Sequence, residues 1–209
     1  KTKQHIDLIS SYGILRLMVL EDAMLRIQFL RGQSPEFEPG RWNYRPEKPA
    51  VWTAKEGRSL VEIATGKIVV RVEKKTGALQ FFDRKGRLLL AEKAQLPRQM
   101  DTVGCRNWMY FDWQKNEKLA AKGVLADQTE RMTQMARYIS FGGKKLRMPL
   151  LYSSQGYGIG VAARGTVLCC AIPMYGPYLY TEGEKQIDYY FLHGENYEEV
   201  VKLYRRISL

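Results

Sequence analysis

Cysteine, histidine and long apolar runs are scarce in this chain of 209 residues, and each scarcity removes a class of protein. Three cysteines, an odd number, do not make a disulfide framework, and no spacing of cysteine and histidine matches a zinc site. We expect Cys169 and Cys170 to lie on opposite faces of one strand as small buried thiols. The sequence therefore predicts no metal and no other cofactor.

No apolar run approaches the roughly 18 residues that a membrane span needs, and residues 1–5 lack the hydrophobic stretch of a signal peptide. We therefore expect a cytoplasmic protein that does not bind membranes. Hydrophobic residues make up 45% of the chain and charged residues 26%, which is ordinary globular usage and excludes a disordered chain. A single domain over residues 1–209 is expected, because this length is enough for one well-buried core.

The formal charge of +11 and the isoelectric point near 9.6 raise the possibility of a nucleic-acid partner. The basic residues are scattered, however, and their densest groups, at residues 71–75, 83–87 and 142–147, coincide with expected hairpin turns. No recognition helix, zinc finger or RNA-binding motif accompanies them. The sequence therefore predicts no nucleic-acid binding, and an acidic partner domain would also account for the excess charge.

Alternation of apolar and polar residues with period 2 recurs along most of the chain and predicts strands. Residues 14–29 form two expected strands around a turn at residues 21–22, with Leu25, Ile27 and Phe29 on one face and Arg26 and Gln28 on the other. Ile68, Val70 and Val72 are likewise expected to face a core. Further strands are expected at residues 60–64, 67–72, 78–82, 87–91, 138–141, 145–153, 157–162, 166–172, 178–181 and 185–193. The fold class is therefore all-β, a large antiparallel sandwich.

Three segments depart from this pattern. Residues 31–49 hold four of the eight prolines and predict an ordered surface loop, while residues 95–137 give no clear assignment. One helix is expected at residues 196–207, where Asn196 is a good N-cap and Glu199 follows three residues later as in a capping box.

Three short motifs occur in a fixed order near the end of the chain: residues 153–158 (Ser-Ser-Gln-Gly-Tyr-Gly), residues 188–191 (Asp-Tyr-Tyr-Phe) and the pair Tyr204 and Arg205. Together they resemble the end of the N-terminal, galactose mutarotase-like β-sandwich domain of glycoside hydrolase family 31, the α-glucosidase and α-xylosidase family. The turn at residues 82–86 is similar to a recurring turn of the same domain. The resemblance implies a catalytic (β/α)8 barrel after residue 209, which this chain does not contain.

In that family the barrel carries both catalytic carboxylates, and the resemblance implies that the intact enzyme cleaves α-linked oligosaccharides with retention through an aspartate nucleophile. Asp112, Asp127 and Asp188 are single acids here, and nothing in the sequence pairs them as glycoside hydrolysis requires. We therefore expect no catalytic residue in this chain, which would be inactive by itself and would brace its own barrel. Asp188 has two interpretations of equal weight, a structural hydrogen-bonding role and a turn-flanking acid.

Two groups of residues are candidates for contacting sugar. Residues 123–132 loosely resemble a strand end and loop that reach the innermost sugar in the family, which makes Asp127, Gln128, Glu130 and Arg131 candidates; the alternatives are a solvated polar loop and packing onto the barrel. Trp108, Tyr110 and Trp113 could form an aromatic platform, and the alternative is core packing or an interdomain interface.

Other classes of function stay open at this stage. A free-standing carbohydrate-binding sandwich is the main alternative, and a basic nucleic-acid-binding module is a third reading. A small mutarotase would need His193 beside Glu195, and such neighbours in sequence rarely converge on one substrate. If the barrel reading holds, the apolar face that the barrel leaves exposed should make the chain self-associate.

Overall fold

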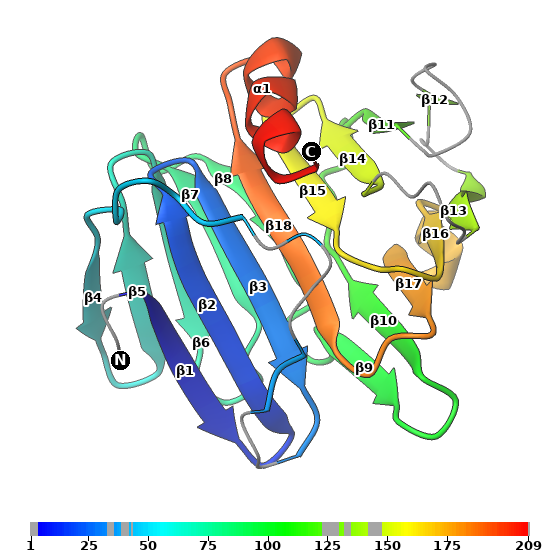
Figure 1. Ribbon diagram of the computed structural model, residues 1–209, viewed down its shortest axis with the longest axis horizontal. Coiled ribbons are helices and arrows are strands. Elements are labelled where there is room, and N and C mark those ends of the chain that lie inside the picture. Colours follow the sequence, from blue (N-terminus) through cyan, green and yellow to red (C-terminus); the bar gives the residue numbers. More distant parts are fainter. Residues whose placement is uncertain are drawn as a thin grey trace.

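The computed structural model describes residues 4–32, 36–38, 42, 44–122, 130–131, 135–141 and 148–208. Strands dominate, every strand pair is antiparallel, and one α-helix, α1 (Tyr197–Ser208), lies near the C-terminus (Figure 1). The molecule is therefore the all-β sandwich that the sequence predicts.

Three sheets make up the sandwich. The eight-stranded sheet runs in the order β1 (His5–Ser10), β2 (Gly13–Glu21), β3 (Met24–Leu30), β18 (Ile187–His193), β15 (Tyr157–Val161), β14 (Leu150–Ser153), β11 (Leu119–Lys122) and β12 (Glu130–Arg131). One five-stranded sheet is a meander of β4 (Thr53–Glu56), β5 (Leu60–Ala64), β6 (Ile68–Glu73), β7 (Leu79–Asp83) and β8 (Leu88–Ala91). The other runs β13 (Ala136–Phe141), β16 (Thr166–Cys170), β17 (Tyr178–Glu182), β10 (Arg106–Tyr110) and β9 (Arg98–Asp101).

The core lies between these sheets. In Figure 1 the meander begins at the left with β4 and β5 and continues behind β1, β2 and β3. An isolated bridge between Glu92 and Phe111 links the two five-stranded sheets. The main apolar cluster includes Ile27 of the eight-stranded sheet, Val70 of the meander and Leu179 of the third sheet, all fully buried. One continuous core therefore serves all three sheets.

The meander confirms the alternation in the sequence. Ile68, Val70 and Val72 are buried, whereas Arg71 between them is exposed. Its turns use glycine where the backbone needs a positive φ, at Gly77 (74°) and Gly86 (83°).

Several short strands were not predicted from the sequence: β1, β4 and the four strands from β9 to β12. The last four fall in residues 95–137, where they have two to five residues each, too few for alternation to stand out. Polar Arg26 and Gln28 do alternate with Leu25 and Ile27 as expected, but both are buried.

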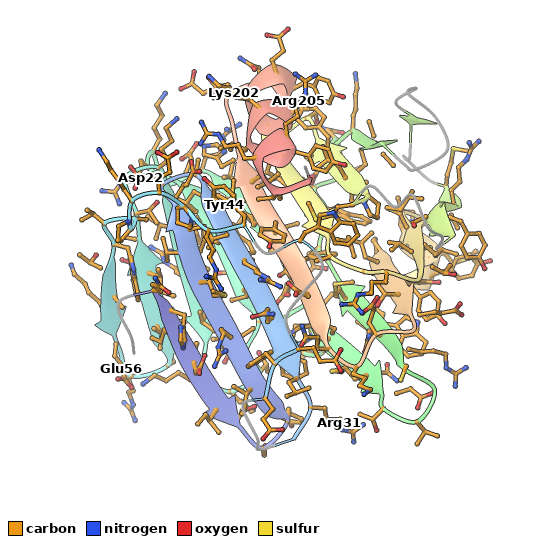
Figure 2. All side chains as sticks on the ribbon, in the orientation of Figure 1. Asp22, Arg31, Tyr44, Glu56, Lys202 and Arg205 are labelled. Atoms are coloured by element: carbon orange, nitrogen blue, oxygen red, sulfur yellow. The ribbon has the colours of Figure 1, made fainter. Side chains whose placement is uncertain are left out.

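The helix α1 and the segment around Trp42 cover the outer face of the eight-stranded sheet. A second apolar cluster joins Trp42 to Val200 and Ile207 of the helix, and Figure 2 shows Lys202 and Arg205 on the helix side that points away from the sheet. Gly158 lets the helix approach, because a Cβ there would lie 2.6 Å from a Val200 methyl carbon. Asn196 caps the helix by accepting the backbone N–H of Glu199, as predicted, while the Glu199 carboxylate accepts the N–H of Glu195.

Candidate functional site

Two of the three predicted platform residues lie together on the outer face of the sheet β13-β16-β17-β10-β9. Trp108 pairs with Tyr180 across β10 and β17, and Tyr110 pairs with Tyr178 two residues away. Leu168 of β16 lies opposite Tyr180, and Tyr138 of β13 lies opposite Leu168, so both extend the same cross-strand row. The side chain of Tyr138 is 52% exposed. Because side chains alternate along a strand, all of these rings share one face, which we call the aromatic face: Trp108, Tyr110, Tyr138, Tyr178 and Tyr180.

The rings of the aromatic face are not coplanar. Trp108 and Tyr180 have centroids 5.1 Å apart and planes tilted by 46°, and Tyr110 meets Tyr178 edge-on at 5.9 Å and 64°. Tyr180 donates a 2.6 Å hydrogen bond to Glu182, and burial together with this carboxylate raises the pKa of Tyr180 to about 12. Such a surface presents ring edges and hydroxyls rather than one flat stacking plane.

The meander provides a contrast within the same molecule. Its outward positions mix apolar Val69 and Phe82 with charged side chains, and Arg71 and Glu62 pair directly across β6 and β5 at 3.0 Å. That is the normal surface of a solvated sheet. The aromatic face is therefore a local feature of one sheet and not a general property of the surface.

Trp113, the third predicted platform residue, lies elsewhere. Its ring stacks on buried Phe111, with centroids 5.7 Å apart and planes 15° from parallel, on the core side of the sheet. Trp113 therefore does not share a face with Trp108 and Tyr110, because the chain leaves β10 after Tyr110. Contact of these three rings with sugar stays a prediction. Trp113 lines a pocket of about 500 Å³ with Asp112, Lys115 and Glu117.

The structure describes only two of the four polar residues predicted to contact sugar. Glu130 and Arg131 form β12, paired with Ala121 and Ala120 of β11 at the edge of the eight-stranded sheet. Asp127 and Gln128 lie outside the described residues, so their role stays a prediction.

Asp188 is a buried structural acid, which decides between its two interpretations. Its carboxylate accepts hydrogen bonds from Arg26 at 2.9 and 2.6 Å and from Gln28 at 3.1 Å. Burial raises the pKa of Asp188, and the hydrogen bonds from Arg26 oppose that rise. Asp112, by contrast, is an exposed acid 3.8 Å from Lys93.

Two further buried carboxylates were missed from the sequence. Glu92 accepts hydrogen bonds from Arg98, from the hydroxyl of Tyr189 and from the backbone N–H of Leu79. Glu117 accepts the hydroxyls of Ser153 and Tyr157. Glu92 ties strands of all three sheets together, whereas Glu117 joins the segment before β11 to β14 and β15 within the eight-stranded sheet. In both cases the partners that explain the burial of the acid include residues far away in sequence.

His193 ends β18 at the turn before α1, as expected. Its Nδ1 donates a hydrogen bond to the carbonyl of Gly156 at 2.8 Å. Cys169 and Cys170 are both buried free thiols, and burial raises the pKa of the Cys169 thiol far above its ordinary value. Within the described residues there is no cluster of three histidine, cysteine, aspartate or glutamate side chains that could hold a metal, and no helix there is long and apolar enough to cross a membrane.

The fold is thus a large antiparallel β-sandwich with a C-terminal helix and a core shared by three sheets. No protein-family model and no curated protein matches the sequence.

Solved structures match it closely in shape. A GH31 α-xylosidase from a soil metagenome, complexed with xylose, has a TM-score of 0.79 at 18% identity, and the match covers all of this chain (100%) and 34% of that one. A GH31 dextranase from Flavobacterium johnsoniae, complexed with isomaltotriose, has a TM-score of 0.78 at 18% identity, with 95% and 26% covered. A cycloalternan-forming enzyme from Listeria monocytogenes has a TM-score of 0.76 at 15% identity, with 98% and 22% covered.

At these identities the likeness establishes the fold. The chain spans about a fifth to a third of the length of the enzymes that it matches. It therefore has the fold of one portion of these larger proteins.

Proposed function

We propose that this chain is the non-catalytic N-terminal β-sandwich domain of a glycoside hydrolase family 31 enzyme that hydrolyses α-linked sugars. The observation that carries the proposal is the asymmetry of coverage: nearly the whole chain matches, but only 26% to 34% of the two GH31 enzymes does. The ordered motifs at residues 153–158, 188–191 and 204–205 support the same family.

The buried acids support a structural role within that enzyme. Asp188, Glu92 and Glu117 are each occupied by hydrogen bonds inside the sandwich, which leaves them unable to serve as the acid and nucleophile of a glycosidase. The chemistry would then belong to a barrel outside this chain, with an aspartate nucleophile and α-glucosides or α-xylosides as substrates.

The aromatic face is the surface that we propose packs on that barrel. Tyrosine and tryptophan are enriched in protein interfaces, and this face gathers four half-buried aromatic rings beside exposed Tyr138. Bracing of the barrel by this face, and contact of sugar by the loop that holds Asp127 and Gln128, are both parts of the proposal.

The test begins with the gene. Reading past the codon for Leu209 should reveal a barrel with an aspartate nucleophile and a downstream acid, and a stop codon at that point would overturn the proposal. The 209-residue chain should not hydrolyse p-nitrophenyl α-glucoside or α-xyloside, whereas the extended protein should hydrolyse at least one α-glycoside.

A further inference from the structure

We infer that the pocket bordered by Trp113 and Asp112 is a binding site for a neutral saccharide of one or two pyranose rings. The class of ligand rests on the proposed function. The location of the site rests on the pocket itself. The pocket lies where the chain passes from β10 to β11, beside the 3-10 helix Pro173–Tyr175, and has a volume of about 500 Å³. That volume is within the range of about 300 to 1,000 Å³ for small-molecule sites.

The walls of the pocket are mainly apolar. Trp113 and Phe111 contribute parallel rings, and Leu119, Ala171, Pro173 and Pro177 complete the lining. Phe111 is fully buried, whereas Trp113 is half-buried, so the remaining accessible part of the indole borders the pocket. Rigid ring surfaces of this kind pack against the apolar C–H face of a pyranose at little cost in conformational entropy.

The segment that carries the polar groups is held in place before any ligand arrives. The buried Glu117 carboxylate accepts the backbone N–H of Gln114 at 2.8 Å and the hydroxyls of Ser153 and Tyr157. The side-chain amide of Gln114 donates a hydrogen bond to the backbone carbonyl of Leu88 at 2.9 Å. These bonds fix the turn from Gln114 to Glu117, so binding need not order it.

Two charged side chains remain at the mouth of the pocket. The Asp112 carboxylate is 59% exposed and only loosely paired with Lys93 at 3.8 Å, and Lys115 is exposed. A carboxylate accepts and an ammonium donates hydrogen bonds, which together match adjacent hydroxyl groups of a sugar. The acids Asp112 and Glu117 are balanced by Lys115 and the neighbouring Lys93, so the site favours a neutral polar ligand over an ion.

The experiment is isothermal titration calorimetry of the purified 209-residue chain with maltose, isomaltose and xylose, and with sorbitol as a polyol without a pyranose ring. We expect saturable binding of at least one sugar with a Kd on the order of 1 mM, and no binding of sorbitol. Asp112→Ala and Lys115→Ala change exposed residues and should each weaken binding by about tenfold.

Trp113→Phe keeps the stack on Phe111 but shrinks the pocket wall and should also weaken binding. Trp108→Phe, the same substitution at a half-buried tryptophan of the aromatic face, is the matched control and should leave the Kd unchanged. Absence of binding by the wild-type chain, equal binding of sorbitol, or binding that survives Asp112→Ala and Trp113→Phe would each overturn the inference.

The two proposals fail separately. If a barrel follows residue 209 but no sugar binds, the pocket inference falls and the family proposal stands. If sugar binds in the pocket and a stop codon follows Leu209, the pocket stands and the chain is a carbohydrate-binding module.

Discussion

Arg26 and Asp188 lie 162 residues apart in the chain and form a two-pronged ion pair on the outer side of the eight-stranded sheet, where both side chains are about 96% buried or more. They occupy paired strands, β3 and β18, and Gln28 and Gln186 add hydrogen bonds to the same carboxylate. The Arg26 guanidinium also lies 5.4 Å from the centre of the Tyr190 ring. The pair therefore joins the N-terminal and C-terminal parts of the fold.

Removing one partner should be costly. Asp188→Asn leaves the Arg26 charge buried without a counter-charge, and we expect a loss of about 3 to 5 kcal/mol in the free energy of unfolding, measured by urea titration. Glu62→Gln breaks the exposed pair with Arg71 and should cost less than about 1 kcal/mol. Equal losses in the two variants would contradict the assignment of Asp188 as a structural anchor.

The Asp7 and Arg16 pair should make stability depend on pH. Arg16 donates two 2.8 Å hydrogen bonds to Asp7 across β1 and β2, and these bonds lower the pKa of Asp7 below its ordinary value of 3.8. A depressed folded-state pKa means that the stabilisation is present above about pH 4 and is lost as the pH falls through the folded-state pKa.

Asp7→Asn should therefore lower the free energy of unfolding by about 1 kcal/mol at pH 6 and by progressively less below pH 4. Urea titrations of the variant and the wild type at several pH values measure this difference. A difference that stays constant down to pH 2.5 would show that the charge of Asp7 is not the cause.

The hydroxyl of Tyr157 should matter more than that of Tyr110. Tyr157 is fully buried and donates to Glu117, so Tyr157→Phe leaves a buried carboxylate short of one donor and should cost about 1 to 3 kcal/mol. Tyr110 donates a 3.3 Å hydrogen bond to Gln99 at the surface, and Tyr110→Phe should change stability by less than about 0.5 kcal/mol. Thermal unfolding of both variants makes the comparison, and a reversed order would refute the role given to Glu117.

The aromatic face should drive self-association of the isolated chain. Tyr138 is 52% exposed in this face, and Tyr138→Asp places a charge in it, so the variant should stay monomeric at concentrations where the wild type associates. Tyr12→Asp, at a 67% exposed tyrosine in the turn between β1 and β2, is the matched control and should behave like the wild type. Sedimentation velocity over a concentration series tests this, and a wild-type chain that stays monomeric throughout would argue against the face as a contact surface.

Much of the sandwich could be predicted from sequence because its longer strands alternate regularly. β5 matches residues 60–64, and the burial of Ile68, Val70 and Val72 follows directly from their spacing. The same rule failed for the two-residue strand β12, which is defined by its pairing with β11 and not by its own sequence.

The candidate sites were harder to predict because they depend on contacts between distant residues. The pairing of Trp108 with Tyr180 requires the register of β10 and β17, and the burial of Glu117 requires Ser153 and Tyr157 from β14 and β15. Trp113 was grouped with Trp108 because they are close in sequence, although the chain leaves the sheet between them. Local pattern thus predicts which residues form strands, while tertiary pairing decides which side chains meet.

The pairing of β3 with β18 also sets the order in which the protein can be completed during its synthesis. Met24–Leu30 is made well before its partner Ile187–His193, since Arg26 and Asp188 on these strands are 162 residues apart. Until β18 has been made, one edge of β3 and the Arg26 guanidinium have no partner. The eight-stranded sheet therefore closes late, through a contact of very high sequence separation. Slow folding, with a nascent chain that is open to misassociation at this edge, is the kinetic consequence of pairing β3 with a strand so far along the chain.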